Sequence, residues 1–146
     1  MILISHRGNI NGCKNEENSP ESIDQAIKLG YDVEIDLWFL NNEYWLGHHM
    51  PKYKVHIDFI QQRQNNLWCH AKNFEALKNM LENNIHCFWH QSDKFTLTSH
   101  GFIWTYPNQN ITNQSVIVCE SAEETKRHIE SGIPYAICSD FVGINT

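Results

Sequence analysis

The sequence has no long apolar segment. No run of apolar residues approaches the roughly 20 that a membrane-spanning helix needs, so we expect no membrane span. Residues 1–5 form a short apolar run that leads directly into His6, without the basic start, long apolar stretch and cleavage site of a signal peptide. We therefore expect a cytoplasmic protein.

Positive charge is also scarce. The 146 residues include 11 Lys and Arg against 17 Asp and Glu, which gives a formal net charge of -6, and there is no basic run or stripe. A nucleic acid or an anionic membrane surface favours such a basic stretch, so the composition argues against both partners. Any phosphate that the protein binds is then expected to meet a few individually placed cations.

Closely spaced cysteines and internal repeats are absent as well. The five cysteines stand at wide intervals without a Cys-x-x-Cys motif, which argues against a structural zinc site. Four of them fall inside predicted strands, so we expect reduced, buried thiols. Because no repeat or low-complexity linker divides the chain, we expect one domain over residues 1–146, with 41% hydrophobic residues to form its core.

Short apolar runs alternate with helical patterns, as in repeated strand and helix units around a largely parallel sheet. The predicted strands are residues 1–5, 33–38, 67–71, 85–89, 102–106, 115–119 and 135–139, with residues 44–46 as an extended arm. About seven strands are too few for the eight units of a full barrel of ~250 residues. We therefore predict an α/β fold of the abbreviated TIM-type (β/α) barrel kind.

Helices are predicted after the N-cap residues Ser19, Asn73 and Ser121, and Gly30 and Gly132 are stop signals. A shorter helix fits residues 56–63. The apolar stripes of two helices predict the faces that pack on the sheet. They are Ile23, Ala26 and Ile27 in the first, and Phe74, Leu77, Met80 and Leu81 in the helix after Asn73.

Polar residues cluster at the carboxyl ends of the predicted strands, where parallel α/β folds bind ligands. Glu34 and Asp36 are two positions apart on one strand, so their side chains point to the same face. Two carboxylates on one inward face repel unless a cation lies between them, and Mg²⁺ or Ca²⁺ is the simplest neutraliser. A solvated edge strand would show the same spacing, but the apolar character of this strand argues against it.

The following strands carry further polar and aromatic candidates. His70 and Lys72 share one face of the third strand, so His70 could complete the metal site and Lys72 could meet an anionic oxygen. A hydrogen-bonded histidine at the rim of the core is the alternative for His70. His90 and Trp104 are candidate substrate contacts, and filling of the barrel interior is the alternative for Trp104.

Four short polar segments follow one another along the first third of the sequence. They are His6-Arg7-Gly8 after the first strand, Glu17-Asn18-Ser19 before the first helix, Glu34-Ile35-Asp36 on the second strand, and Gly47-His48 after the arm. In this order and spacing the chain resembles the glycerophosphodiester phosphodiesterases, barrel enzymes of the wider phospholipase-C-like group. Lys72, Trp104-Thr105 and Ser139-Asp140-Phe141 resemble later elements of that family.

The resemblance implies a role for each of these residues. By it, His6 and His48 are the general acid/base pair, Arg7 contacts the phosphate, and Glu34 and Asp36 bind a divalent metal. Glu17 would either bind the metal or orient Arg7. A histidine with an ordinary pKa of ~6.5 can take a proton from an attacking water or hydroxyl and return one to the leaving alkoxide. The implied reaction is hydrolysis of a small phosphodiester with a glycerol-like or sugar-like group.

His70 departs from the family pattern, which has a glutamate ligand there, and this opens the site to Mn²⁺ or Zn²⁺ besides Mg²⁺ or Ca²⁺. Two other functions stay open. One is a non-catalytic descendant that binds a phosphorylated ligand, and the other is a lyase in which a substrate hydroxyl attacks its own phosphate to give a cyclic product. An oligomer that covers the apolar edges of a shortened barrel stays open too.

Overall fold

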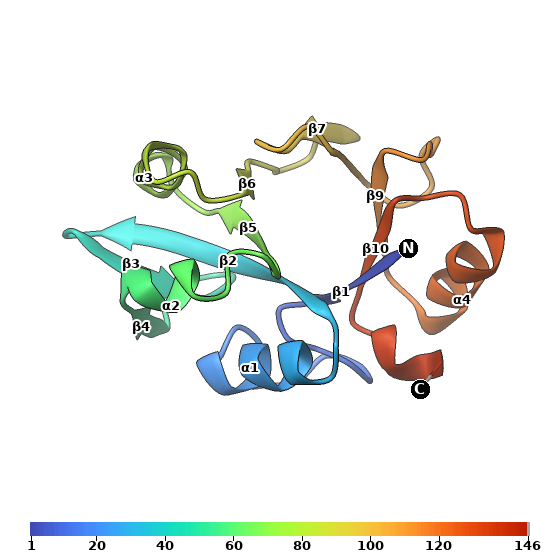
Figure 1. The fold of residues 1–146 in the computed structure, drawn as a ribbon, viewed down its shortest axis with the longest axis horizontal. Helices are drawn as coiled ribbons and strands as arrows, with labels where there is room; N and C mark the ends of the chain where they lie inside the picture. The colour runs from blue at the N-terminus through green and yellow to red at the C-terminus, as the bar shows by residue number, and fades with distance from the viewer. Residues whose placement is uncertain (146) are drawn as a thin grey trace.

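The computed structural model describes residues 1–145, which form one curled sheet with helices packed on its outside (Figure 1). Within these residues the strands are β1 (Ile2–His6), β2 (Asp32–Leu40), β3 (Glu43–Leu46), β4 (Tyr53–Val55), β5 (Leu67–Ala71), β6 (Cys87–Phe88), β7 (Phe95–Leu97), β8 (Ile103–Thr105), β9 (Ser115–Cys119) and β10 (Ala136–Ser139). The helices are α1 (Pro20–Lys28), α2 (Ile57–Gln61), α3 (Phe74–Glu82) and α4 (Ala122–Ser131), followed by the 3-10 helix η1 (Val142–Asn145).

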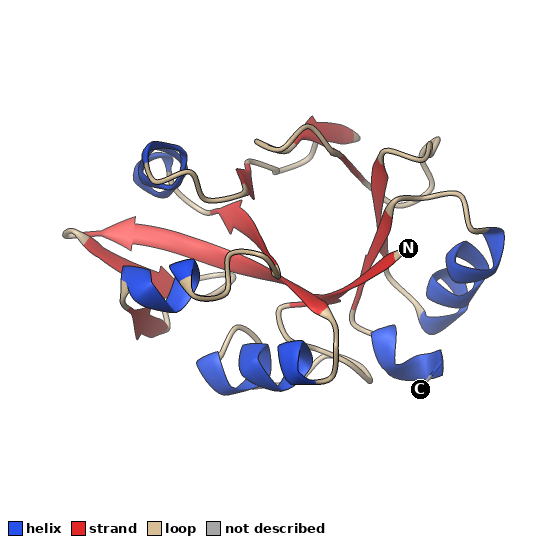
Figure 2. Cartoon of the chain, in the orientation of Figure 1, coloured by secondary structure: helices blue, strands red, loops and turns tan. Residues whose placement is uncertain are grey.

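The centre of the sheet is parallel and runs in the order β6-β5-β2-β1-β10-β9-β8. The long strand β2 continues past its parallel neighbours into an antiparallel arm with β3 and β4, while β7 returns antiparallel to β8. Figure 2 shows the strands arranged in a curl with the helices on its outside. This arrangement brings the carboxyl ends of the parallel strands to one rim.

The curled α/β sheet agrees with the predicted fold class, but the sheet is open and does not form a closed TIM barrel. In the described part of the chain, no strand ladder joins β6 to β7. Single hydrogen bonds cross this seam: the backbone N–H of Ser99 donates to the carbonyl of Cys87 at 2.8 Å, and the N–H of Cys87 donates to Oγ of Ser99 at 2.9 Å. The strands beside the seam are short, with two residues in β6 and three in β7.

Strands β4 and β7 were not among the predicted strands. β7 lies in a polar stretch, and its apolar residues Phe95 and Leu97 face solvent, while Thr96 between them donates a hydrogen bond to the carbonyl of Trp89. In a strand with one buried face the apolar side chains usually point to the core, but here they point to solvent. The sequence pattern therefore did not predict this strand.

Three predicted N-caps and the stop at Gly132 are confirmed, while the short helix predicted over residues 56–63 is shorter and spans Ile57–Gln61. The side chains of Ser19, Asn73 and Ser121 cap α1, α3 and α4 by accepting a hydrogen bond from the backbone N–H three residues later. Gly132 ends α4 in the left-handed conformation, with φ of 62°. The predicted face of α3 is partly wrong, because Ala76 and Met80 are its buried residues.

The alternation along β2 separates the core from the site. Val33, Ile35 and Leu37 point outward into the layer beneath α1 and α3, and Glu34 and Asp36 point to the inside of the curl. A second apolar cluster, which includes Ile4, Trp68, Phe88, Trp104 and Val116, fills the inside of the curl. Four of the cysteines are buried in the strands, and all five are free thiols.

No helix in the described residues has the length and apolar character needed to cross a membrane.

Candidate active site

A cavity of about 550 Å³ opens at the rim formed by the carboxyl ends of the parallel strands. It brings together residues from β1, β2, β5, β6 and β8 that are far apart in the sequence. Eight of the ten predicted site residues line it: His6, Arg7, Glu34, His48, His70, Lys72, His90 and Trp104. The other two, Asp36 and Glu17, are not among the lining residues but contact Arg7, which is.

Asp36 is the buried centre of the charged side of the cavity, with 0% of its surface exposed. Its Oδ2 lies 3.0 Å from Nε of Arg7 and accepts hydrogen bonds from Nδ1 of His48 at 3.1 Å and Nδ2 of Asn18 at 3.0 Å. Burial alone would raise the pKa of Asp36, but the hydrogen bond from His48 and the charge of Arg7 hold it well below its usual range. Asp36 is therefore a fixed carboxylate.

Glu34, Asp36 and His70 form the group that could hold a metal ion, since one ligand atom from each lies within 4.8 Å of the others. Nδ1 of His70 is 3.2 Å from Oδ1 of Asp36 and 3.7 Å from Oε1 of Glu34. Oδ1 of Asp36 and Oε2 of Glu34 are buried and make no hydrogen bond to the described residues. Two such oxygens beside an imidazole nitrogen are a donor set that fits a divalent cation.

The ring of His70 is held from its other side. Because a carbonyl only accepts, Nε2 of His70 donates the 2.8 Å hydrogen bond to the backbone carbonyl of His90. This leaves Nδ1 facing the carboxylates. Burial alone would lower the pKa of His70, but the contacts with Asp36 and Glu34 raise it to about 9. Lys72 adds a second cation, with Nζ 3.5 Å from Oδ1 of Asp36.

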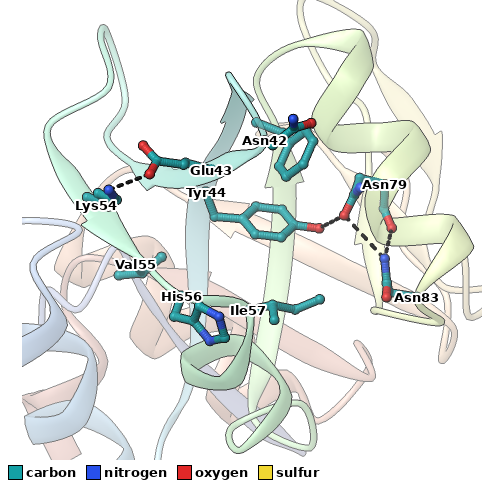
Figure 3. A pocket seen from close by; sticks show the side chains of 10 residues that line it. Asn42, Glu43, Tyr44, Lys54, Val55, His56, Ile57, Asn79 and Asn83 are labelled. Carbon is teal, nitrogen blue, oxygen red and sulfur yellow. Dashed lines mark hydrogen bonds and ion pairs between the residues drawn. The ribbon is translucent and has the colours of Figure 1, made fainter.

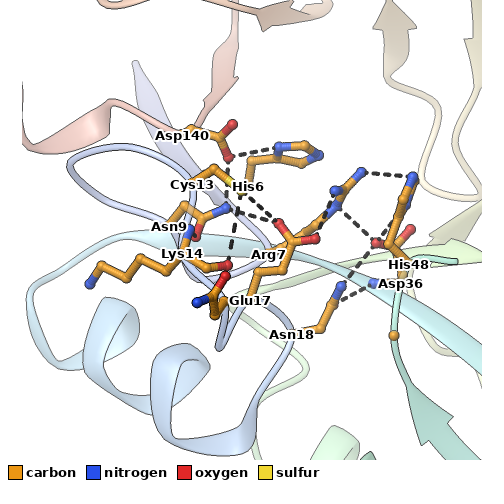
Figure 4. A network of polar contacts seen from close by, with 12 residues as sticks. His6, Arg7, Asn9, Cys13, Lys14, Glu17, Asn18, Asp36, His48 and Asp140 are labelled. Atoms are coloured by element: carbon orange, nitrogen blue, oxygen red, sulfur yellow. Dashed lines mark hydrogen bonds and ion pairs between the residues drawn. The ribbon is translucent and has the colours of Figure 1, made fainter. Parts of the chain in front are cut away.

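His6 is held by Asp140, a residue of the Ser139-Asp140-Phe141 motif that was not among the predicted site residues. Nδ1 of His6 donates to Oδ1 of Asp140 at 2.9 Å, and Nδ2 of Asn9 donates to the same oxygen at 2.8 Å (Figure 4). Burial alone would lower the pKa of His6, but the hydrogen bond to Asp140 and the charge of Glu34 raise it. Its Nε2 lies 3.8 Å from Oε2 of Glu34.

Arg7 connects Glu17 with His48. Its Nη1 donates to Oε1 of Glu17 at 3.1 Å, and its Nη2 donates to Nε2 of His48 at 3.3 Å. Because the guanidinium of Arg7 can only donate, Nε2 of His48 accepts with its lone pair, while Nδ1 of His48 donates to Asp36. Of the two roles considered for Glu17, the contacts favour orientation of Arg7, because Glu17 lies outside the group of potential metal ligands in the described residues.

The backbone turn after β1 places Arg7 in the cavity. Arg7 has φ of 56° and its N–H donates to the carbonyl of Glu34, while its own carbonyl accepts from the N–H of Asn18. Gly8 follows with φ of 83°, and a Cβ there would lie 2.9 Å from the backbone of Ser22. Only glycine therefore allows this turn to pass so close to α1.

The opposite wall of the cavity is aromatic. Phe88 stacks on Trp104 with ring centroids 4.2 Å apart and on His70 at 5.1 Å. His90 and Tyr106 lie at the same side, and both ring nitrogens of His90 are buried without a hydrogen-bond partner in the described residues. Burial, with the charge of His70, lowers the pKa of His90, so this ring favours its neutral form.

A second cavity, of about 640 Å³, lies outside the curled sheet between the β3-β4 arm and α3 (Figure 3). Tyr44 lines it and donates a hydrogen bond from its hydroxyl to Oδ1 of Asn79, while Glu43 pairs with Lys54 at the edge. None of the predicted site residues lines this cavity.

Comparison of the chain with models of known protein families, with curated proteins and with solved structures finds no match.

Proposed function

We propose that this protein is a metal-dependent phosphodiesterase that hydrolyses a small phosphodiester of the glycerophosphodiester kind. The observation that carries the proposal is the pair His6 and His48, each with Nδ1 donating to a carboxylate, at one cavity with Arg7 and the Glu34 carboxylate. The resemblance of four ordered segments to the glycerophosphodiester phosphodiesterases supports the same reaction.

The two histidines have different surroundings, and these suggest different roles. Nε2 of His48 accepts in this arrangement, so His48 suits the base that takes a proton from the attacking water. His6 donates to Asp140 and lies beside Glu34, which favours its charged form, so it suits the acid that protonates the leaving alkoxide. For His48 to accept a proton, Arg7 has to exchange its contact with Nε2 for one with a phosphoryl oxygen.

Positive charge surrounds the place proposed for the phosphoryl group. Arg7 and Lys72 line the cavity on either side of Asp36, and both can donate to phosphoryl oxygens. Glu34, Asp36 and His70 would hold the divalent cation, which when bound adds further stabilisation of the charge that grows on those oxygens. Glu17 holds Arg7 in position from behind.

The alcohol part of the substrate would lie on the aromatic side of the cavity. His90 offers two unpartnered ring nitrogens that can exchange hydrogen bonds with hydroxyl groups. Trp104 and Phe88 offer apolar contact to the carbon skeleton. Location in the cytoplasm and assembly into an oligomer stay predictions.

The test is turnover of bis-nitrophenyl phosphate and of glycerophosphodiesters with Mg²⁺, Ca²⁺, Mn²⁺ or Zn²⁺ added. We expect cleavage that His6→Ala and His48→Ala each lower by about 100-fold to 10,000-fold. His56→Asn is the matched control, because His56 is an exposed helix cap that asparagine can replace. The proposal fails if no diester is cleaved with any of these metals, or if the two alanine variants keep full activity.

A further inference from the structure

We infer that His70 makes this a mixed nitrogen and oxygen metal site that binds Zn²⁺ most tightly, Mn²⁺ less tightly, and Mg²⁺ or Ca²⁺ weakly. The inference rests on the metal site of the proposed function and reverses the order of ions expected from the carboxylate pair alone. It concerns metal binding and does not require that a phosphodiester is cleaved.

The position of the His70 nitrogen is held by three contacts of different kinds. The backbone of β5 places His70 opposite Asp36 in the register of the sheet. Its ring stacks on Phe88 with an angle of 10° between the planes, and its Nε2 donates to the carbonyl of His90. Metal-binding histidines usually donate their second ring nitrogen in this way, because it fixes the tautomer and the direction of the ligating nitrogen.

The separations of the donor atoms suit a small ion with few ligands. Nδ1 of His70 lies 3.2 Å from Oδ1 of Asp36 and 3.7 Å from Oε1 of Glu34. Two ligands of a tetrahedral ion with bonds of about 2.1 Å are about 3.4 Å apart, and the two separations lie on either side of that value. All three ligand atoms lie within 4.8 Å of one another, so an ion between them would draw the carboxylates toward His70.

The same surroundings disfavour the hard ions. Ca²⁺ takes about six to eight oxygen ligands and Mg²⁺ an octahedron of oxygens, with Mg²⁺ releasing its water reluctantly. The group here offers two carboxylates and an imidazole, and the other sides of Asp36 face Arg7 and Lys72. The positive charges of Arg7 and Lys72 oppose every divalent ion alike, so the types of ligand atom decide between the ions. An imidazole nitrogen gains most with Zn²⁺, less with Mn²⁺ and least with Mg²⁺ or Ca²⁺.

The experiment titrates the metal-free full chain with the chlorides of Zn²⁺, Mn²⁺, Mg²⁺ and Ca²⁺ by calorimetry, one ion at a time. We expect one Zn²⁺ per chain, bound at least about 100-fold more tightly than Mg²⁺ or Ca²⁺. Co²⁺ is a second probe, because its visible absorption becomes strong when four or five ligands bind it. A weak, six-coordinate Co²⁺ spectrum, or Mg²⁺ bound as tightly as Zn²⁺, would overturn the inference.

Replacing His70 by an aspartate tests whether His70 causes the preference for Zn²⁺. His70→Asp is expected to lower Zn²⁺ affinity by at least about 10-fold and to raise Mg²⁺ or Ca²⁺ affinity, since all three ligands are then oxygens. His56→Asp is the control, because it also exchanges a histidine for a carboxylate but lies outside the ligand group. An unchanged preference in His70→Asp contradicts the inference, and the Co²⁺ spectrum of the natural chain decides if that variant does not fold.

These binding experiments can fail or succeed independently of the test of the proposed hydrolase function. If Zn²⁺ binds as expected and His70→Asp changes the preference, but no diester is cleaved, the metal inference stands and the hydrolase proposal fails. If diesters are cleaved but Mg²⁺ binds as tightly as Zn²⁺, the hydrolase proposal stands and the metal inference fails.

Discussion

The side chains of His6 and Asp140 are joined by a hydrogen bond of 2.9 Å, although 134 positions separate them in the chain. The parallel pairing of β1 with β10, in which Ser5 lies opposite Ser139, brings them together. Because the carboxylate can only accept, Nδ1 of His6 carries the hydrogen and Nε2 is left for proton exchange. Asp140 thus orients the residue that we propose as the acid.

Asp140→Asn tests this orientation. The variant keeps the size of the side chain but removes the negative charge that favours the protonated ring and its tautomer. We expect kcat for diester cleavage to fall by about 100-fold while KM changes little, as is usual for loss of acid/base assistance. Asp58→Asn, an exposed aspartate on α2, is the control. If both variants cleave at the same rate as the natural chain, Asp140 has no orienting role.

Gly47→Ala tests the turn that positions His48. Gly47 has φ of +149°, and an added Cβ would lie 2.0 Å from the carbonyl oxygen of Met50, so the backbone has to move. Gly30→Ala is the control, with φ of +93° but no atom within 4 Å of the added Cβ. From urea denaturation we expect a loss of about 1 kcal/mol for Gly30→Ala and of more than about 2 kcal/mol for Gly47→Ala. Equal losses would show that the contact with Met50 is readily relieved.

Asn18→Ala tests the support of the buried Asp36 carboxylate. Asn18 donates to Oδ2 of Asp36 and accepts from its backbone N–H, and both residues are fully buried. We expect a loss of about 2–3 kcal/mol in the free energy of unfolding, because a buried charge loses one of its hydrogen bonds and a buried N–H loses its acceptor. Asn84→Ala is the matched control, since Asn84 also has positive φ but is exposed. A loss no larger than that of the control would contradict this account.

The lowered pKa of His86 leads to a prediction of how the free energy of unfolding depends on pH. His86 is buried against Trp68 and His100, and burial, followed by the effect of His100, lowers its pKa from 6.5 to about 4. Because the unfolded chain then binds a proton more readily than the folded one, stability is expected to fall as pH decreases from about 6.5 to about 4. His86→Gln should flatten that part of the stability curve, whereas His49→Gln, at an exposed position, should not. Parallel curves for all three proteins would contradict the prediction.

The residues that sequence reasoning placed correctly depend on short-range geometry. Ser19, Asn73 and Ser121 each cap a helix by bonding a backbone group three positions away, and this contact follows from the local chain alone. Glu34 and Asp36 share a face because successive side chains of a strand alternate. Both patterns have a fixed period, so they can be recognised before any long-range contact is known.

Other features depend on which distant segments pack together. The pairing of His6 with Asp140, the support of Asp36 by Asn18 and the outward direction of the apolar residues of β7 leave no periodic signal in the sequence. The open seam between β6 and β7 likewise depends on strand lengths and packing.

By itself the sequence determined the α/β alternation, the helix ends and the residue types of the site. The tertiary structure decided that the sheet stays open, that Asp140 and Asn18 support the site, and that Glu17 faces Arg7. The physical reason is that hydrogen bonds within a helix or the alternation of a strand involve neighbours in the chain. A contact between distant residues forms only when the whole sheet has curled and its strands have found their register.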